Sequence, residues 1–129
     1  MSLVRVIVVG WFVLAAGFAR ADDRPWANGV SEPAQKVALE LYERGNKLFV
    51  EKSYSEALKL YREAIASWDH PAIRFNIAEC LISLDQPLEA YENLLASLRF
   101  GEPAIGAEYF ERAMRTKVLS GVSAGRLLK

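Results

Sequence analysis

The chain has little of the chemistry that enzymes and metal proteins use, with one cysteine and one histidine among its 129 residues. A single cysteine cannot form an intramolecular disulfide, so packing alone must hold the fold. The sequence also lacks a zinc-ligand spacing, a glycine-rich phosphate loop and a nucleophile elbow. We therefore expect no catalytic residue, no cofactor and no metal site, and we predict that the protein is not an enzyme.

Structural roles suit these two residues better. His70 follows Asp69 in a turn directly before Pro71, where either side chain can cap the next helix. Cys80 is expected to be buried as a small apolar side chain, with pairing to a second chain as the alternative.

Neither sign of charge dominates, because 16 lysines and arginines balance 16 aspartates and glutamates. Proteins that bind nucleic acid concentrate basic residues into a positive field, and no such field is present. The scattered carboxylates have lysines or arginines nearby, which is typical of a solvated surface. No nucleic-acid partner is expected.

A long hydrophobic run occurs only at the start of the chain. Arg5 precedes the uncharged apolar segment 6–18, and Ala19 and Ala21 supply the small residues that a signal peptidase reads. The run is shorter than the roughly 20 apolar residues that cross a bilayer, which disfavours the alternative of an uncleaved anchor. We predict a signal peptide over 1–21, export of the protein, and no stable membrane span after cleavage.

Strict alternation of apolar and polar residues, the mark of strands, is missing from the rest of the sequence. Residues 22–33 are rich in turn formers and predict a flexible lead-in, with Trp26 folding back onto the first helix. Apolar residues then recur at three- and four-residue steps, which predicts amphipathic helices over 34–51, 54–68, 71–84, 88–99 and from Pro103 through Val118. Gly121 and Gly125 weaken the end, so 121–129 is expected to be a tail or a truncated continuation.

Two helix starts carry capping signals. Ser53 stands three residues before Glu56, the spacing of a capping box in which the hydroxyl and the carboxylate each bond a backbone N–H. Asp85 is the cap candidate before Pro87, which suits the first turn of the next helix.

Two halves of the helical region repeat each other at an offset of 33 residues. The corresponding pairs are Gly45 and Ala78, Glu56 and Glu89, Ala57 and Ala90, Tyr61 and Leu94, and Ala64 and Ser97. A period of this size marks a repeat architecture, in which each unit buries its apolar face only against its neighbours. Repeat proteins of this kind bind far more often than they catalyse.

This pattern resembles the tetratricopeptide repeat (TPR) family, in particular its exported bacterial members. That family places small residues where its paired helices A and B cross, as at Gly45, Ala57 and Ala64 here. The segment Asn76-Ile77-Ala78 is similar to the Asn-Leu-Gly element common in the family. Arg74 departs from the pattern, because the family has an apolar residue at that position.

The resemblance covers about 38–100 and implies an all-α fold. We expect a short TPR-like α-solenoid of antiparallel helix pairs, with repeat 1 over 34–70, repeat 2 over 71–100 and a capping helix over 101–120. The last segment lacks the small-residue pattern, which suits the solvated end that a terminal repeat needs.

Helix A of a TPR lines a concave groove, and the resemblance carries that role to seven positions: Leu39, Tyr42, Asn46, Phe49, Phe75, Glu79 and Ile82. Apolar and aromatic side chains with a few polar groups suit an apolar or helical peptide, which Asn46 and Glu79 would orient. The alternative is that the lead-in or the last helix covers this face and makes it core, since small domains rarely leave a large apolar patch bare.

Some TPRs grip the C-terminal carboxylate of a peptide with asparagines, at positions that match Asn46 and Asn76. Such a clamp also needs lysine and arginine, and Tyr42 stands at one of the lysine positions. We therefore reject a carboxylate clamp and expect Asn76 to bond to backbone between the repeats.

The function implied by the resemblance is that of a scaffold that holds a protein or peptide partner in the bacterial cell envelope. The periplasm is the expected location, with secretion as the alternative. Two other functions stay open: a structural spacer that self-associates through its exposed end, and the N-terminal part of a larger envelope protein that continues into a β-rich domain.

Overall fold

The computed structural model describes residues 24–127, so the signal peptide predicted over 1–21 lies outside the described residues. Between residues 24 and 127 the chain forms helices and no strand. The helices are η1 (Pro25–Ala27, a 3-10 helix), α1 (Glu32–Val50), α2 (Tyr54–Ser67), α3 (Pro71–Ser83), α4 (Pro87–Leu98), α5 (Glu102–Ile105) and α6 (Ala107–Leu127). In this described part, no helix is long and apolar enough to span a membrane.

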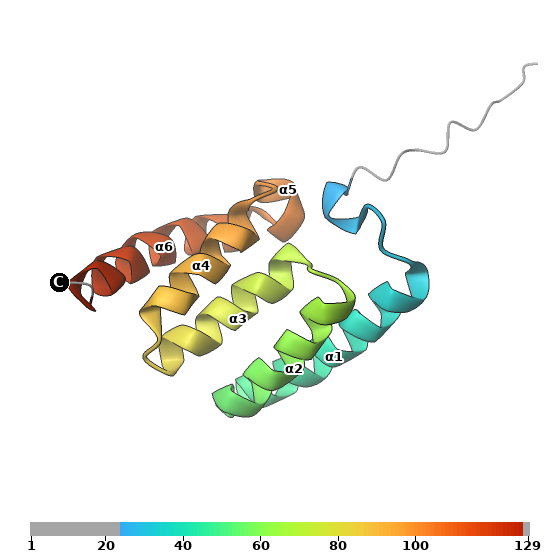
Figure 1. Ribbon diagram of the computed structural model, residues 1–129, viewed down its shortest axis with the longest axis horizontal. Coiled ribbons are helices and arrows are strands. Elements are labelled where there is room, and N and C mark those ends of the chain that lie inside the picture. The colour runs from blue at the N-terminus through green and yellow to red at the C-terminus, as the bar shows by residue number, and fades with distance from the viewer. Residues whose placement is uncertain (1–23, 128–129) are drawn as a thin grey trace, which may run out of the picture.

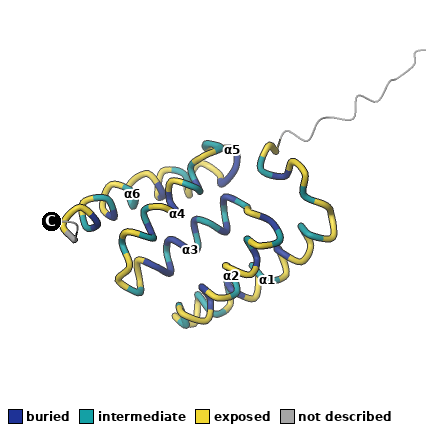
Figure 2. The backbone as a smooth tube through the Cα atoms, viewed as in Figure 1, coloured by how far each residue is buried: buried dark blue, intermediate teal, exposed yellow. Residues whose placement is uncertain are grey.

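The long helices pack as antiparallel pairs that stack side by side (Figure 1). α1 pairs with α2 and α3 pairs with α4, while α2 packs on α3 and α6 packs on α4. α3 lies inside the stack and has no exposed residue from 71 to 81 (Figure 2). The predicted all-α, TPR-like arrangement of helix pairs is confirmed, and it is consistent with a short α-solenoid.

Small side chains lie where the paired helices approach each other. Ala57 and Ala64 of α2, and Ala90 and Ser97 of α4, have no exposed surface. The 33-residue offset relates these positions, so the repeat in the sequence corresponds to equivalent packing in the two helix pairs. A larger side chain at any of them would push the helices apart.

The two pairs fill the same crossing with different side chains. Gly45 of α1 faces Tyr61 of α2 so closely that a Cβ at position 45 would lie 2.6 Å from Cε1 of the tyrosine ring. In the second pair, Ala78 and Leu94 belong to one buried cluster, and neither they nor Tyr61 have exposed surface. The larger ring therefore stands opposite the residue without a side chain.

Of the predicted caps at the starts of α3 and α2, the structure contains the first and not the second. His70 is the N-cap of α3 as expected, and its Nδ1 accepts a hydrogen bond from the N–H of Ala72 at 3.0 Å. The capping box at Ser53 and Glu56 is wrong, because the Ser53 hydroxyl makes no cap hydrogen bond. The N–H of Ser53 instead donates to the carbonyl of Leu48 at 2.9 Å and is not free for the carboxylate of Glu56.

Asp85 does not cap α4 either. Its φ of 57° is left-handed and ends α3, while Gln86 occupies the N-cap position without a side-chain hydrogen bond. Lys52, which lies 33 positions earlier, has a φ of 61° at the equivalent turn between α1 and α2. The repeat therefore extends to the backbone of the turns.

The single helix predicted from Pro103 is wrong. Gly106 has a φ of 84° and ends the four-residue α5, so that α6 begins at Ala107. The periodicity did not reveal this break because Ala104 and Ile105 are buried as core positions of one helix would be.

The segment 121–129, predicted to be a tail or a truncated continuation, is helical as far as the structure describes it. α6 continues through Gly121 and Gly125 to Leu127. A Cβ at position 121 would lie 3.2 Å from Cε2 of Tyr91, so the glycine lets α6 lie close to α4. Packing therefore outweighs the low helix propensity of glycine.

The lead-in predicted to be flexible is ordered where the structure describes it. Trp26 lies in η1, and its ring contacts His70 and Phe100 at centroid distances of 6.2 and 6.0 Å. Nε1 of Trp68 donates to the carbonyl of Trp26 at 2.8 Å, and Ala27 is buried. Trp26 thus anchors the segment at the junction of the two pairs instead of along α1.

Arg74, the departure from the TPR pattern, joins the repeats through its charge. Its guanidinium makes two hydrogen bonds to the Asp69 carboxylate, at 2.6 and 2.9 Å, and one to Oδ1 of Asn93 at 3.1 Å. The hydrogen bonds to Asp69 raise the pKa of Arg74 above the ordinary value of an arginine side chain. The side chain therefore ties the turn before α3 to α4.

Candidate functional site

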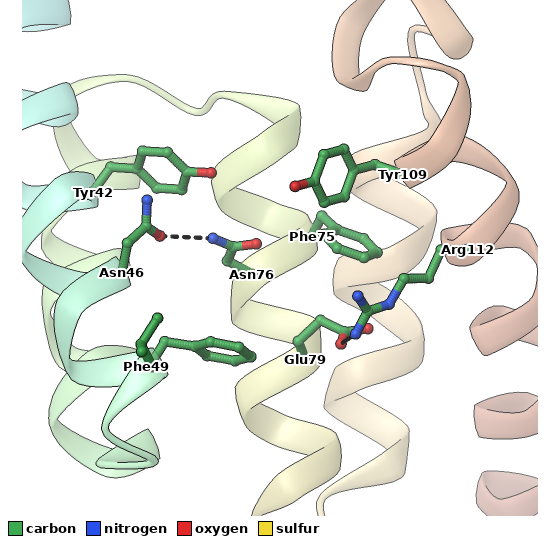
Figure 3. A pocket seen from close by; sticks show the side chains of 9 residues that line it. Tyr42, Asn46, Phe49, Phe75, Asn76, Glu79, Tyr109 and Arg112 are labelled. Atoms are coloured by element: carbon green, nitrogen blue, oxygen red, sulfur yellow. Dashed lines mark hydrogen bonds and ion pairs between the residues drawn. The ribbon is translucent and has the colours of Figure 1, made fainter.

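A groove of about 230 Å³ opens between α1, α3 and the first turns of α6 (Figure 3). Three helices supply its walls, which are formed by Tyr42, Asn46, Phe49, Val50, Phe75, Asn76, Glu79, Tyr109 and Arg112. Because η1 packs at the junction of the helix pairs, the described part of the lead-in, residues 24–33, does not close the groove.

Most of the residues predicted for a groove come together here, namely Tyr42, Asn46, Phe49, Phe75 and Glu79. Leu39 is 43% exposed and lies outside the groove. Ile82 is 39% exposed and borders a separate cavity of about 180 Å³ between the α3–α4 turn and α6. The structure therefore places these two residues apart from the other five.

A hydrogen-bond network fixes the polar side of the groove. Oδ1 of Asn46 accepts a hydrogen bond from the Tyr61 hydroxyl at 2.7 Å and another from Nδ2 of Asn76 at 2.9 Å. The expectation that Asn76 bonds to backbone is wrong, because its partners are the side chains of Asn46 and Tyr61. The Tyr42 hydroxyl adjoins the same network, since hydrogen bonds with the side chains of Asn46 and Asn76 act on its pKa.

Two tyrosines, Tyr42 and Tyr61, lie next to this network. The rings of Tyr42 and Tyr61 lie 5.8 Å apart. Burial raises the pKa of both hydroxyls above the ordinary value of 10.0. The Tyr61 hydroxyl donates to Oδ1 of Asn46 and so helps to keep this amide in one orientation.

The apolar side of the groove combines buried and accessible rings. Phe75 is only 3% exposed and belongs to a core cluster, so it forms the floor. Tyr109 packs edge-on against it at 5.6 Å and is itself 49% exposed. Phe49 is half-buried against Tyr54, with ring centroids 5.3 Å apart. Phe49 and Tyr109 are therefore the rings that a ligand can touch.

An ion pair closes one edge of the groove. Arg112 donates a hydrogen bond to the carboxylate of Glu79, and its guanidinium carbon lies 5.8 Å from the centre of the Phe75 ring. The side chain of Glu79 is 13% exposed whereas that of Arg112 is 53% exposed. The guanidinium therefore retains donors for another acceptor at the groove edge.

Tyr109 and Arg112 are groove residues that the sequence analysis missed, because it assigned 101–120 to a cap. A signal was present. The offset of 33 takes Asn46 to Glu79 and then Glu79 to Arg112, and all three line the groove. α6 therefore occupies the helix A position of a third unit.

Cys80 is buried as expected, and this burial, together with the charge of Glu79, raises the pKa of its thiol to about 12. Within residues 24–127, no group of three or more histidine, cysteine, aspartate or glutamate side chains is placed to hold a metal ion. The chemistry that the groove displays is hydrogen bonding and apolar contact.

Comparison with known proteins gives distant similarity only. No protein-family profile matches the chain, and no solved structure matches it. Among curated proteins, the chain is similar to the mitochondrial import receptor subunit TOM70 from two strains of Saccharomyces cerevisiae. The identity is 34% over 58 residues, which cover 45% of this chain and only 9% of TOM70. Because TOM70 contains TPRs, the similarity agrees with a helical repeat.

Proposed function

We propose that the groove binds an apolar segment of a partner protein, and that the protein is a binding scaffold and not an enzyme. One observation carries the proposal: the accessible rings of Phe49 and Tyr109 lie in an open groove beside asparagine amides held in a fixed orientation. Peptide sites have this form, with apolar surface for burial and a few placed polar groups for orientation.

The geometry suggests how such a segment would bind. An apolar side chain of the partner would pack between Phe49 and Tyr109. Nδ2 of Asn46 would donate to a backbone carbonyl of the segment, and Oδ1 of Asn76 would accept from a backbone N–H. Because internal hydrogen bonds already orient both amides, little side-chain entropy is lost on binding. An acidic residue next to the apolar anchor would pair with Arg112.

The distant similarity to an import receptor supports protein binding as the general function. Export and a location in the bacterial cell envelope are part of the proposal, and they rest on residues 1–21 and on the family resemblance. Mass spectrometry of the protein from its native cell tests this part. A mature chain that begins at Asp22 is expected, whereas a retained N-terminus would contradict export by cleavage.

The binding proposal is tested with a photo-reactive side chain in the groove. Tyr109→p-benzoylphenylalanine places the probe on an accessible wall, and illumination in the native cell should give a cross-linked partner whose attached peptide mass spectrometry identifies. A synthetic copy of that peptide is then titrated against the parent protein and the Phe49→Ala and Arg112→Ala variants. We expect binding at least about tenfold weaker for Phe49→Ala, since about 1.4 kcal/mol of ring contact is lost.

The matched control carries the probe at Leu95, which is 45% exposed on α4 and remote from the groove walls. Equal cross-linking to the same partner from both positions, or equal affinity of the parent and Phe49→Ala proteins, would exclude the groove as the binding site. Phe75 is unsuitable for this purpose because it is also a core residue.

A further inference from the structure

The outer face of α6 carries an apolar stripe that no described residue covers. Met114, Val118 and Val122 follow one another at steps of four and are 40%, 60% and 58% exposed. Figure 1 shows α6 at the edge of the stack, beside α4 and with no long helix beyond it. An apolar stripe with this spacing is typical of a helix face that packs on another helix.

The repeat indicates what kind of element fits the stripe. The offset of 33 aligns Leu48 of α1, Leu81 of α3 and Met114 of α6. Leu48 packs against the first core cluster, and Leu81 has no exposed surface. Each of these two helices is followed by a partner helix that packs along it, whereas Met114 remains 40% exposed. Met114 therefore stands at a position that a partner helix covers in both preceding units, and Val118 and Val122 continue the stripe along α6 beyond it.

We propose that this face binds α6 of a second copy of the chain in an antiparallel, two-fold arrangement. An axis near Val118 sets Met114 of one copy against Val122 of the other. The same axis brings Glu111 near the N-terminal end of one helix next to Arg126 near the C-terminal end of the other. A parallel arrangement would instead place like charges together, so the charge pattern selects the antiparallel one.

The charged groups that this arrangement uses are accessible. Glu111 has a side chain 75% exposed and lies 3.8 Å from Arg115 of its own helix, which is 72% exposed. A solvated pair of this kind contributes little and leaves the carboxylate free to turn to a second partner. α6 has 21 residues and is about 31 Å long, so the interface is small and the dimer is expected to be weak.

Sedimentation of the purified full chain tests the proposal, with the N-terminal form fixed by mass spectrometry and kept the same for all variants. Between about 5 μM and 1 mM protein we expect a rising dimer fraction, since small interfaces have micromolar to millimolar dissociation constants. Val118→Lys should weaken the dimer at least about tenfold without changing the helical circular dichroism, because Val118 is 60% exposed. The matched control Val37→Lys alters a valine that is 47% exposed on α1 and should leave the dimer unchanged.

Charge reversal tests the antiparallel geometry separately. Glu111→Lys should weaken the dimer, and the double variant Glu111→Lys with Arg126→Glu should restore it. A chain that stays monomeric at about 1 mM overturns the proposal, as does a dimer that Val118→Lys leaves intact. Failure of the double variant to restore a dimer lost in Glu111→Lys overturns the antiparallel pairing. None of these variants lies in the groove, so a failure here leaves the groove proposal to its own test.

Discussion

The two helix pairs fill equivalent helix crossings with different side chains. In the first pair Tyr61 fills the crossing, and Gly45 makes room for it by having no side chain. In the second pair Leu94 is the filler and Ala78 stands at the position equivalent to the glycine. Both fillers are fully buried. A larger residue on one helix is thus matched by a smaller residue on the other, and the helix spacing is kept.

The difference between the fillers has a consequence for the groove. The Tyr61 hydroxyl reaches through the crossing and donates to Oδ1 of Asn46 on the groove side. Leu94 has no polar group that could do the same in the second pair. The hydrogen-bond network that orients the groove amides therefore begins in the first pair, and α3 and α6 complete the groove around it.

The largest effect is expected where the two pairs are most alike. Ala57→Trp and Ala90→Trp each introduce an indole at a position with no exposed surface. We expect each change to cost more than about 4 kcal/mol and to prevent cooperative folding. Circular dichroism during thermal unfolding measures this. A parent-like melting temperature for either variant would show that the helices are not closely apposed at that position.

A smaller effect separates the pairs at the glycine. Gly45→Ala places a Cβ 2.6 Å from the Tyr61 ring, and overpacking of this kind costs about 2 kcal/mol even after the gain in helix propensity. That loss lowers the melting temperature of a domain of this size by roughly 8–16 °C. As the control, Gly125→Ala adds the same methyl where nothing lies within 4 Å and should stabilise slightly. Equal effects of the two changes would contradict the tight crossing.

The junction between the pairs provides a pH-dependent comparison. Burial, with the charge of Arg24 adding, lowers the pKa of His70 from 6.5 to about 4. The unfolded chain therefore binds a proton more readily than the folded one, so stability is fully present above pH 6.5 and falls as the pH drops toward 4. Protonation of Nδ1 also removes the acceptor that caps α3. Allowing for partial exposure, we expect a loss of about 1–2 kcal/mol, measured as urea unfolding at pH 7 and pH 4.5.

The control for this prediction is His70→Asn, since asparagine caps helices but does not titrate. The part of the acid destabilisation that is due to His70 should disappear in this variant. An unchanged pH dependence would assign the effect to other groups.

The smallest effect concerns the hydroxyl group of Tyr61, the residue that fills the crossing of the first helix pair. Tyr61→Phe keeps the ring and removes the hydroxyl that donates to Asn46, so we expect a loss of about 1 kcal/mol in the free energy of unfolding. Binding of the cross-linked peptide should also weaken, because Asn46 then keeps only the hydrogen bond from Asn76. Titration calorimetry compares the two proteins, and equal affinity would show that the network does not prepare the groove.

The fold could be predicted from the sequence because the residues that a close helix crossing requires occur twice, once in each repeat. Small residues at Ala57 and Ala90 recur in register, and a helical crossing is the structure that demands them. Local features were harder to predict. The break at Gly106 depends on one glycine with positive φ, and glycine is compatible with either conformation. The Ser53 cap failed because the backbone already satisfied the N–H that a capping box would use.

The groove was predicted in part for a related reason. The resemblance to the TPR family implies a groove along the first helix of each pair, and it placed Tyr42, Asn46 and Phe75 on that surface. Tyr109 and Arg112 stand 33 positions after the groove residues Asn76 and Glu79, but they lie on a helix whose small-residue pattern differs and which was therefore assigned to a cap. The exposure of a side chain depends on how the helices stack, which the sequence does not give. Phe75 is therefore buried at the floor of the groove, whereas Tyr109 is exposed on its wall.

The equivalence of the two pairs is the central claim, and a double-mutant cycle tests it most directly. Gly45→Ala combined with Tyr61→Leu converts the first crossing into the combination found at Ala78 and Leu94. The free energy of unfolding, from urea titrations of the parent, both single variants and the double variant, gives the coupling between the positions. The account predicts that Tyr61→Leu removes the overpacking, so that the double variant is more stable than the sum of the single effects by about 1–2 kcal/mol. Strict additivity would contradict it.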